Sequence, residues 1–425
     1  MLQVNVLRNN PQFVKDRLAI KNFKQLELVD EIIALDDERK KLQAEFDSLQ
    51  SKINASSKEI GKLMSTGKKD EAEQLKTSIA EWKSSIEPIK KNAAEIEKKL
   101  EETIVLLPNL PSELVPKGFG AEDNLNVKES GNKPALPANA LPHWELTKKY
   151  KLIDFELGTK ITGAGFPVYT GKGAKLQRAL IQYFLDYNTG AGYKEIIPPF
   201  MVNADSAFGT GQLPDKEGQM YFVNEDGFYL IPTSEVPVTN IYRDVIVKQD
   251  ELPIKMTAYS PCFRREAGSY GKDVRGLNRL HQFEKVEIVQ IVEAEKSYAA
   301  LDEMVAHVEK LVQSLELPYR ILRLCGGDMS FASALTYDFE VYSAAQQRWL
   351  EVSSVSNFES YQTNRLKCRY KDENGKMQLA HSLNGSSLAL PRILACILEN
   401  NQTENSIKLP ADLKNYFGAD EITAG

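Results

Sequence analysis

Apolar residues recur at alternating steps of three and four positions from Leu28 to Leu107. One series ends at Leu63, and a second begins at Leu75 after the polar stretch 65–70. A repeat of 3.5 residues is typical of a coiled-coil seam. Two such series joined by a short turn predict an antiparallel helical hairpin over residues 28–107. Its helices would hold about 36 residues each and be roughly 55 Å long.

A hairpin of this length exceeds the diameter of a small domain, so it should project as an arm. Most projecting coiled coils serve for dimerisation or tethering. An arm can also lie along an extended partner as a ruler. The repeat alone leaves both roles open.

The pattern changes after residue 107. Prolines and glycines between Pro108 and Gly120 end the helical repeat, and residues 121–140 remain polar, so we expect a linker at 111–140. Short strand-like runs and two amphipathic helices, within 165–189 and 293–317, follow. The sequence therefore predicts an N-terminal domain at 1–110, with its arm at about 28–107, and a second domain at 141–425.

Two strand-like runs within 255–291 are rich in Tyr, Phe, Val and Ile. The loop between them, from about Ala267 to Asn278, carries Gly, Ser and charged residues, so a long-looped antiparallel hairpin is predicted. Residues two apart on a strand share a face. One surface would therefore gather a cation, an aromatic ring and carboxylates: Arg264 and Glu266 from the first strand, and Phe283, Lys285 and Glu287 from the second.

This surface has two interpretations. A nucleoside triphosphate beside an amino acid needs all three groups, with Arg for phosphate, Phe for the base and Glu for an ammonium group. The alternative is a ladder of cross-strand salt bridges on a solvated face of the sheet. Spacing alone does not decide between them.

Composition narrows the class of protein. The chain has 425 residues, 42% of them hydrophobic and 26% charged, which fits a soluble globular protein of two or three domains. No apolar run approaches the roughly 20 residues that span a bilayer, and the N-terminus lacks a signal-peptide pattern, so we expect a cytoplasmic protein without membrane association. The net charge of −6 argues against general affinity for nucleic acid, so any RNA contact would need a local basic patch.

The cysteines and histidines do not indicate a metal centre. The chain has four of each, without CxxC spacing and without a histidine pair near a cysteine. We therefore expect neither structural zinc nor a disulfide framework.

Three segments resemble the motifs of class II aminoacyl-tRNA synthetases, in the form found in the seryl-tRNA synthetase family. FRREAGSYGKDVRG followed by HQFEKVE, within 263–287, resembles motif 2 and is the most specific match. The helix and the paired prolines within 165–200 resemble motif 1, which builds the dimer interface in that family. HSLNGSSLALPR at 381–392 resembles motif 3. The resemblance covers essentially the whole chain, arm included.

The resemblance implies an α+β fold: a long antiparallel coiled-coil hairpin, then a catalytic domain built on an antiparallel sheet flanked by helices. It implies a homodimeric ligase that activates L-serine with ATP and Mg²⁺ to seryl-adenylate and pyrophosphate. The enzyme would then transfer serine to the 3′ end of serine tRNA, and whether selenocysteine tRNA is also charged stays open.

The family holds the long variable arm of the tRNA on its coiled coil. Four lysines near the tip of the predicted arm, Lys58, Lys62, Lys68 and Lys69, fit phosphate contacts. Lysine on a solvated helix face is equally normal.

The resemblance also implies roles in ATP binding. Arg264 would hold the α-phosphate and Arg392 the terminal phosphate, and these two are the catalytic residues. The adenine amino group would donate to Glu266, while Phe283 would stack on the ring. The full ATP set implied is Arg264, Arg265, Glu266, Leu280, Phe283, Glu351, Val352, Ser353, Ser354 and Arg392.

Glu351 and Ser354 are the implied magnesium ligands, and oxygen ligands suit this hard cation. Strand alternation, however, predicts Glu351 and Ser353 on one face and Ser354 on the other.

Serine binding is implied for Thr233, Ser234, Glu235, Arg264, Glu287, Asn384 and Ser386. The Thr-Ser-Glu segment at 233–235 has an alternative interpretation as a helix N-cap followed by an acidic first turn. Both interpretations can hold together.

The sequence departs from the family pattern at three positions. Arg265 replaces a more usual serine, but alternation directs it to the face opposite Arg264. Ser387 stands where glycine is common. Leu335 stands where lysine is often found, and the sequence offers no reason for it.

Two competing functions remain. One is a coiled-coil tethering protein with a degenerate globular head. The other is a synthetase paralogue that activates an amino acid for a carrier protein, although such paralogues lack the arm. Serine-dependent exchange between ATP and pyrophosphate would separate the first of these from a synthetase.

Overall fold

The computed structural model describes residues 1–266 and 275–424. The chain divides into two compact units. The first comprises Met1–Ala19 and Phe23–Pro108, and the second comprises Ile20–Asn22 and Asn109–Gly425.

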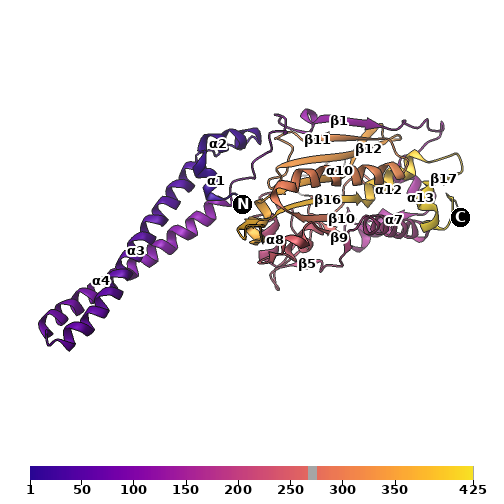
Figure 1. Ribbon diagram of the computed structural model, residues 1–425. Helices are drawn as coiled ribbons and strands as arrows, with labels where there is room; N and C mark the ends of the chain where they lie inside the picture. The colour runs from indigo at the N-terminus through magenta and orange to yellow at the C-terminus, as the bar shows by residue number, and fades with distance from the viewer. Residues whose placement is uncertain (267–274, 425) are drawn as a thin grey trace. The chain divides into compact units, whose positions relative to one another are not determined.

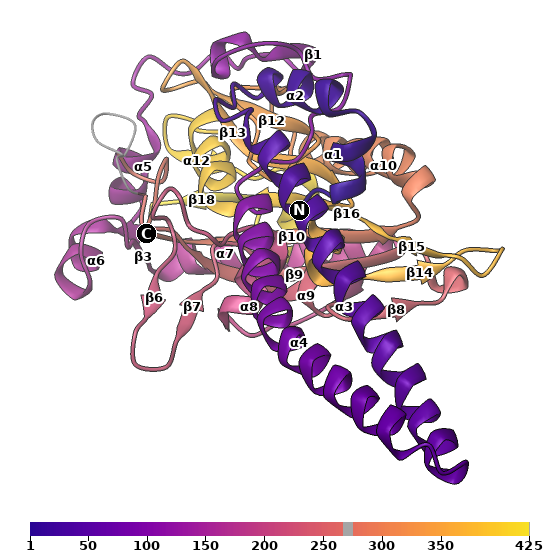
Figure 2. The same cartoon turned by 90° about the vertical axis from the view of Figure 1, so that its left-hand side faces the viewer.

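The first unit is helical. It contains α1 (Val4–Asn9), α2 (Pro11–Ile20), α3 (Leu28–Ser65) and α4 (Lys69–Ile104). Figure 2 shows α3 and α4 side by side and joined by a short turn, in which Gly67 adopts a left-handed φ of 78°. The predicted hairpin is therefore confirmed. Its seam buries Ile53, Ile79 and Ile86, with Phe46, Leu49, Ile60 and Trp82 partly buried against them.

One carboxylate is buried in this unit, and the sequence patterns did not single it out. Asp36 of α3 has a side chain only 4% exposed. Arg8, Arg39 and Lys40 approach its oxygens at 2.7, 2.8 and 2.8 Å. Burial opposes ionisation, but the hydrogen bonds from these three cations prevail and lower the pKa of Asp36.

The second unit is built on an eight-stranded sheet. In spatial order its strands are β1 (Leu125–Ser130), β11 (Tyr319–Arg323), β12 (Leu335–Ser343), β13 (Arg348–Glu359), β16 (His381–Ala389), β10 (Gln282–Val292), β9 (Ile254–Phe263) and β4 (Lys194–Glu195). All neighbours pair antiparallel except β4, which is parallel to β9. The antiparallel sheet predicted for this unit is confirmed.

Helices cover one face of this sheet over a single apolar core. The core side chains come from α7 (Gly171–Gly190), α10 (Ser297–Ser314), α12 (Leu390–Asn400) and the central strands, and Figure 1 shows α10 and α12 lying along the sheet. Alternation along β10 explains the two faces. Val286, Ile288 and Val292 enter this core, while Val289 and Ile291 enter a second cluster on the opposite side.

Smaller elements complete the unit. The helices are α5 (His143–Lys149), α6 (Phe155–Ile161), α8 (Ala204–Thr210), α9 (Glu235–Asn240), α11 (Tyr361–Leu366) and α13 (Ala411–Phe417), with 3-10 turns at Ala121–Asp123, Gln249–Glu251 and Ala294–Lys296. Four small sheets pair β2 (Ile153–Asp154) with β3 (Val168–Tyr169), β7 (Phe228–Leu230) with β5 (Met201–Val202) and β6 (Phe222–Val223), β14 (Arg369–Lys371) with β8 (Ile246–Val247) and β15 (Met377–Leu379), and β17 (Ser406–Lys408) with β18 (Glu421–Thr423).

Two edges of the main sheet bear on the sequence predictions. The segment expected to be linker contributes β1, which pairs along β11 although nearly all its side chains are exposed. At the other edge, β4 ends before Pro198 and Pro199, as expected for residues that cannot donate to a ladder. Among the described residues, no helix has both the length and the apolar composition needed to cross a bilayer.

The central hairpin forms with the predicted pairing. β9 and β10 run antiparallel from Phe263 opposite Gln282 to Ile254 opposite Ile291. Residues 267–274 of the predicted loop lie outside the described residues. β9 ends at Phe263, so Arg264 and Glu266 follow the strand instead of lying on it, and Glu266 has a φ of 49°. Their placement on one surface with β10 therefore depends on the chain after the strand, because alternation no longer applies there.

Candidate functional site

A cleft of about 610 Å³ lies beside the central strands of the second unit. Fifteen of the lining residues matter for the predictions, and they come from segments far apart in the sequence: Thr233, Glu235, Arg264, Glu266, Leu280, Phe283, Lys285, Glu287, Glu351, Val352, Ser353, Ser354, Asn384, Ser386 and Arg392. The structure thus brings together nearly all of the predicted site residues.

Arg264 lies over an aromatic ring. Its guanidinium carbon is 5.2 Å from the ring centroid of Phe283, and its Nε donates to the carbonyl of Pro232 at 3.4 Å. Among the described residues, no carboxylate lies within ion-pair distance of Arg264. The guanidinium therefore keeps donors that can bind an anion in the cleft.

Arg392 enters the cleft from the first turn of α12. Its Nη1 donates to the carbonyl of Glu351 at 2.8 Å and lies 3.4 Å from the Glu351 carboxylate. Its Nε donates to the carbonyl of Asn278 at 3.1 Å. A cation near a helix N-terminus opposes the helix dipole, so this position favours a bound anion.

Two buried carboxylates face each other at the deep end of the cleft. Glu287 on β10 lies opposite Ser386 on β16 and forms an ion pair with Lys285. Gln362 Nε2 donates to Glu235 Oε1 at 2.6 Å. Burial, and then the negative charge of Glu287, raise the pKa of Glu235 to about 7, against smaller opposing effects of Gln362, Lys285 and Asn384. Such a pair would gain from a cationic ligand.

The Thr-Ser-Glu segment satisfies both of its interpretations in part. α9 begins at Glu235, and the Glu235 backbone N–H donates to Thr233 Oγ1 at 3.2 Å. The Glu235 side chain is buried and lines the cleft, whereas an ordinary acidic first-turn residue is solvated. The segment therefore both begins a helix and lines the site.

The predicted alternation along β13 is wrong at Val352. Ser354 pairs with Asp338 and Glu351 pairs with Glu340, with a register shift between them. Asp338 and Glu340 are two apart and share a face, and residues opposite one another on paired strands also share a face. The bulge at Val352 therefore brings Glu351 and Ser354 to one face, which alternation had separated.

Asp338 adds a second carboxylate beside Glu351. Burial and then the charge of Glu351 raise the pKa of Asp338 well above its usual value, although a hydrogen bond from Ser354 opposes this. Its Oδ1 is buried without a hydrogen-bond partner. Two crowded carboxylates and a hydroxyl, with one oxygen unsatisfied, fit the ligand preference of a hard divalent cation.

Two predicted side chains lie outside the cleft lining. Ser234 is buried, and its Oγ lies 2.6 Å from Ser260 Oγ. Arg265 donates to the carbonyl of Met220 at 2.9 Å and stacks over Tyr221. The prediction that Arg265 faces away from Arg264 thus agrees with the structure, and its side chain does not line the cleft.

The salt-bridge interpretation is partly realised as well. Arg279 pairs with Glu266 at 2.9 Å, and Lys285 pairs with Glu287. These pairs form around a cleft and not on a flat solvated face.

The cleft also includes Lys285, Asn278 and parts of 210–219 and 330–332, to which the sequence predictions gave no site role. Strand alternation identified the position of Lys285, but no local pattern marks the others.

Both units match known families. Residues 1–111 match a family model described as the seryl-tRNA synthetase N-terminal domain, and residues 221–401 match the tRNA synthetase class II core domain (G, H, P, S and T). A serine–tRNA ligase of Salinibacter ruber is 49% identical to this chain over 426 residues, with 100% of each chain covered.

Solved structures agree with the sequence comparison. The seryl-tRNA synthetase from Pyrococcus horikoshii complexed with ATP has a TM-score of 0.94 at 31% identity, covering 100% of both chains. The cytoplasmic serine-tRNA ligase from Naegleria fowleri in complex with AMP has a TM-score of 0.88 at 28% identity, covering 100% of this chain and 99% of that one. The similarity therefore includes the arm as well as the sheet.

Proposed function

The chain belongs to the seryl-tRNA synthetase family, and we propose that its cleft joins L-serine to ATP and then passes the seryl group to serine tRNA. One observation carries this proposal. A single cleft holds an arginine with spare donors, an aromatic ring and two buried carboxylates, of which Glu287 pairs with Lys285 and Glu235 has a raised pKa. ATP and serine together supply the matching phosphate, base and ammonium groups.

ATP would lie along the wall formed by the hairpin and α12. Phe283 would stack on the adenine ring, with Leu280 beside it and Glu266 accepting from the adenine amino group. Arg264 would hold the α-phosphate and Arg392 the terminal phosphate. The position of Arg392 at a helix start supports this assignment.

Glu351 and Ser354 would hold Mg²⁺, with Asp338 beside them. The bulge at Val352 and the unsatisfied Oδ1 of Asp338 support this set. When bound, the cation would neutralise charge on the phosphates of ATP.

Serine would occupy the deep end of the cleft. Its ammonium group would pair with Glu287 and Glu235, and its hydroxyl would bond Thr233, Asn384 or Ser386. Alanine and glycine cannot satisfy the polar groups that receive this hydroxyl, which favours serine by a large factor.

The first step requires positioning more than acid–base chemistry. A carboxylate oxygen of serine attacks the α-phosphorus as the bond to pyrophosphate breaks, and the nucleophile is already ionised, so no general base is needed. Arg264 would stabilise the charge that develops on the α-phosphate. In the second step the ribose 3′-hydroxyl of tRNA attacks the seryl carbonyl, and AMP leaves.

The arm would receive the long variable arm of serine tRNA. Lys58, Lys62, Lys68 and Lys69 lie near its tip and would contact phosphates. Lys68 already pairs with exposed Glu71 at 2.8 Å, a bond that solvent screening keeps weak.

A homodimer is proposed from the surface near the motif 1 segment. Ile197 is 84% exposed, and Phe200, Met201, Phe222 and Phe228 are also exposed large apolar residues of the following segments. Met201, Phe222 and Phe228 lie on the three strands of one small sheet, and exposed apolar side chains grouped in this way favour a protein interface. We place the enzyme in the cytoplasm, where charged tRNA is used.

Exchange between ATP and labelled pyrophosphate tests the proposal directly. Serine should support exchange, while glycine and alanine at equal concentration should not. Loss of serine dependence would contradict the proposed amino acid. Serine-dependent exchange without charging of serine tRNA would instead indicate a carrier-protein acceptor.

A further inference from the structure

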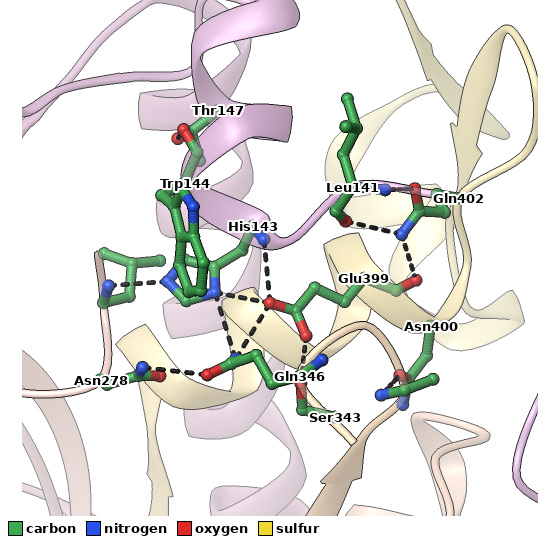
Figure 3. A network of polar contacts seen from close by, with 12 residues as sticks. Leu141, His143, Trp144, Thr147, Asn278, Ser343, Gln346, Glu399, Asn400 and Gln402 are labelled. Atoms are coloured by element: carbon green, nitrogen blue, oxygen red, sulfur yellow. Dashed lines mark hydrogen bonds and ion pairs between the residues drawn. The ribbon is translucent and has the colours of Figure 1, made fainter. Parts of the chain in front are cut away.

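A buried polar network links α5 with α12 (Figure 3). At its centre, His143 Nδ1 and Glu399 Oε1 are 2.6 Å apart, and both side chains are completely buried. The backbone N–H of His143 also donates to Glu399 Oε1 at 2.8 Å. Neither residue lines the cleft, so the proposed chemistry does not explain this pair.

The hydrogen bonds fix the tautomer of His143. The backbone N–H of Leu277 donates to His143 Nε2 at 2.8 Å, so Nε2 is the acceptor and the ring hydrogen lies on Nδ1. Nδ1 therefore donates to Glu399. A Cβ at residue 276 would lie 2.2 Å from Nε2, so only Gly276 allows the chain to approach the ring this closely.

A second branch reaches the next residue of the same segment. Gln346 Nε2 donates to Glu399 Oε1, and Asn278 Nδ2 donates to Gln346 Oε1, each at 3.0 Å. Ser343 Oγ donates to the other oxygen of Glu399. The Glu399 carboxylate is thus satisfied on both oxygens, and it holds residues 277 and 278 through two intermediaries.

The held segment in turn contacts Arg392. Arg392 Nε donates to the carbonyl of Asn278 at 3.1 Å. Arg392 and Glu399 are seven positions apart on α12, which is two turns, so both lie on the same side of the helix. The helix therefore fixes this segment near its C-terminal end, and the segment fixes the guanidinium near the helix start.

We propose that the His143–Glu399 pair is a positioning device for Arg392, acting through Leu277 and Asn278. This inference rests on the proposed function, in which Arg392 meets the terminal phosphate of ATP. The other contacts of Arg392 are with Glu351: Nη1 donates to its backbone carbonyl at 2.8 Å and lies 3.4 Å from its carboxylate, which is 48% exposed. The carbonyl of Asn278 holds Nε, so the two carbonyls together set the direction of the guanidinium, and displacement of residues 277 and 278 should turn it.

The test compares nucleotides that differ only in the phosphates that Arg392 would contact. In the full-length protein, His143→Ala should weaken ATP binding about tenfold in calorimetric titration, equivalent to about 1.4 kcal/mol. AMP binding should change less than about twofold. In serine-dependent exchange, the KM for ATP should rise while the KM for serine stays unchanged. Equal losses for ATP and AMP, or no loss for either, would overturn the proposal.

The chain offers a matched control. His381 is a half-buried histidine of this unit, and its Nδ1 lies 2.8 Å from Ser297 Oγ, outside the cleft. His381→Ala should lower the melting temperature without changing the ATP-to-AMP ratio. If His143→Ala does not fold, Gln346→Ala cuts the second branch at a half-buried residue and should raise the ATP Kd about threefold. A ratio unchanged in Gln346→Ala would overturn the proposal.

A double-mutant cycle locates the effect. If the pair acts through Arg392, His143→Ala should cost little further ATP affinity in an Arg392→Ala background. Additive losses would overturn the proposed route. Failure of the proposed function is distinguishable, because the wild-type protein would then show no serine-dependent exchange at all.

Discussion

The pKa values of buried carboxylates are shifted in opposite directions in the arm and in the cleft. In the arm, Asp36 is surrounded by three cations, and its pKa is lowered. In the cleft, burial and a neighbouring carboxylate raise the pKa of Glu235 to about 7. The same two causes raise the pKa of Asp338, which does not itself line the cleft but lies beside the lining residue Glu351. The first environment already supplies the positive charge that the carboxylate needs. The second leaves it to be supplied by a ligand, which is how a binding site differs from a structural ion pair.

The largest effect should come from Arg264, which pairs with no carboxylate among the residues that the structure describes. Arg264→Ala should reduce serine-dependent exchange on the order of 10³-fold, because Arg264 is the group that we propose to stabilise the α-phosphate. Stability should hardly change, since the contacts of this side chain within the described part of the chain are a 3.4 Å hydrogen bond and a ring contact. Steady-state exchange and thermal unfolding measure the two quantities.

Arg265→Ala is the matched control for this prediction. It removes an adjacent guanidinium that bonds Met220 and stacks on Tyr221 outside the cleft. We expect less than about a threefold loss of exchange, within the range of ordinary surface substitutions. Similar losses in the two variants would mean that overall positive charge matters, and the contrast between cleft and surface would fail.

Removal of the arm should separate the two units by activity. Deletion of residues 28–107, closed by a short Gly/Ser linker, should leave exchange within about threefold of wild type, because the lining residues of the cleft belong to the second unit. Charging of serine tRNA should fall at least about 100-fold with the loss of several phosphate contacts. Parallel assays of exchange and charging measure this. Equal loss of both activities would show that the arm is needed for folding or for the cleft itself.

The two regions also differ in how far the sequence predicted them. The arm follows from a local repeat, so the start of its first helix at Leu28 and the turn within 65–70 could be predicted from the sequence. The β9–β10 hairpin was predicted for the same reason. The bulge at Val352 was not, because it depends on pairing with Phe339 and Glu340 on another strand. The His143–Glu399 pair joins residues 256 positions apart, and no local pattern marks such a contact.

The resemblance to the family motifs predicted some of the site residues that local patterns could not bring together. It brought Glu351, Ser354 and Arg392 into one predicted site, although alternation had separated the first two. It also included Ser234 and Arg265, whose side chains turn out to lie away from the cleft. A motif specifies neighbouring residues together, while the fold decides which side chain of each run faces the ligand.

The raised pKa of Glu235 should appear in serine binding. Above pH 7 the carboxylate is largely ionised and pairs with the ammonium group, whereas at pH 6 only about a tenth is ionised. The KM for serine should therefore rise several-fold to tenfold between pH 8 and pH 6, with the KM for ATP much less affected. Glu235→Gln should remove this slope and raise the KM for serine at pH 8. An unchanged slope in the variant would assign the titration to another group.

The smallest effect should come from the carboxylate that is already paired. Asp36→Asn removes the charge that Arg8, Arg39 and Lys40 share, and should destabilise α1 and α3 by about 1 kcal/mol, because Arg39 and Lys40 are exposed and solvent screens them. The lowered pKa makes this contribution full above the ordinary carboxyl pKa of about 3.9, and it is lost as the pH falls through the folded value. Amide hydrogen exchange of α3 at pH 7 measures this stability.

Asp47→Asn is the control, since Asp47 is exposed on the same helix and, among the described residues, bonds Gln43. Equal protection in the two variants would show that the ion pairs around Asp36 do not stabilise α3. The lowered pKa of Asp36 would then have no counterpart in stability, and only the raised pKa of Glu235 would support the comparison.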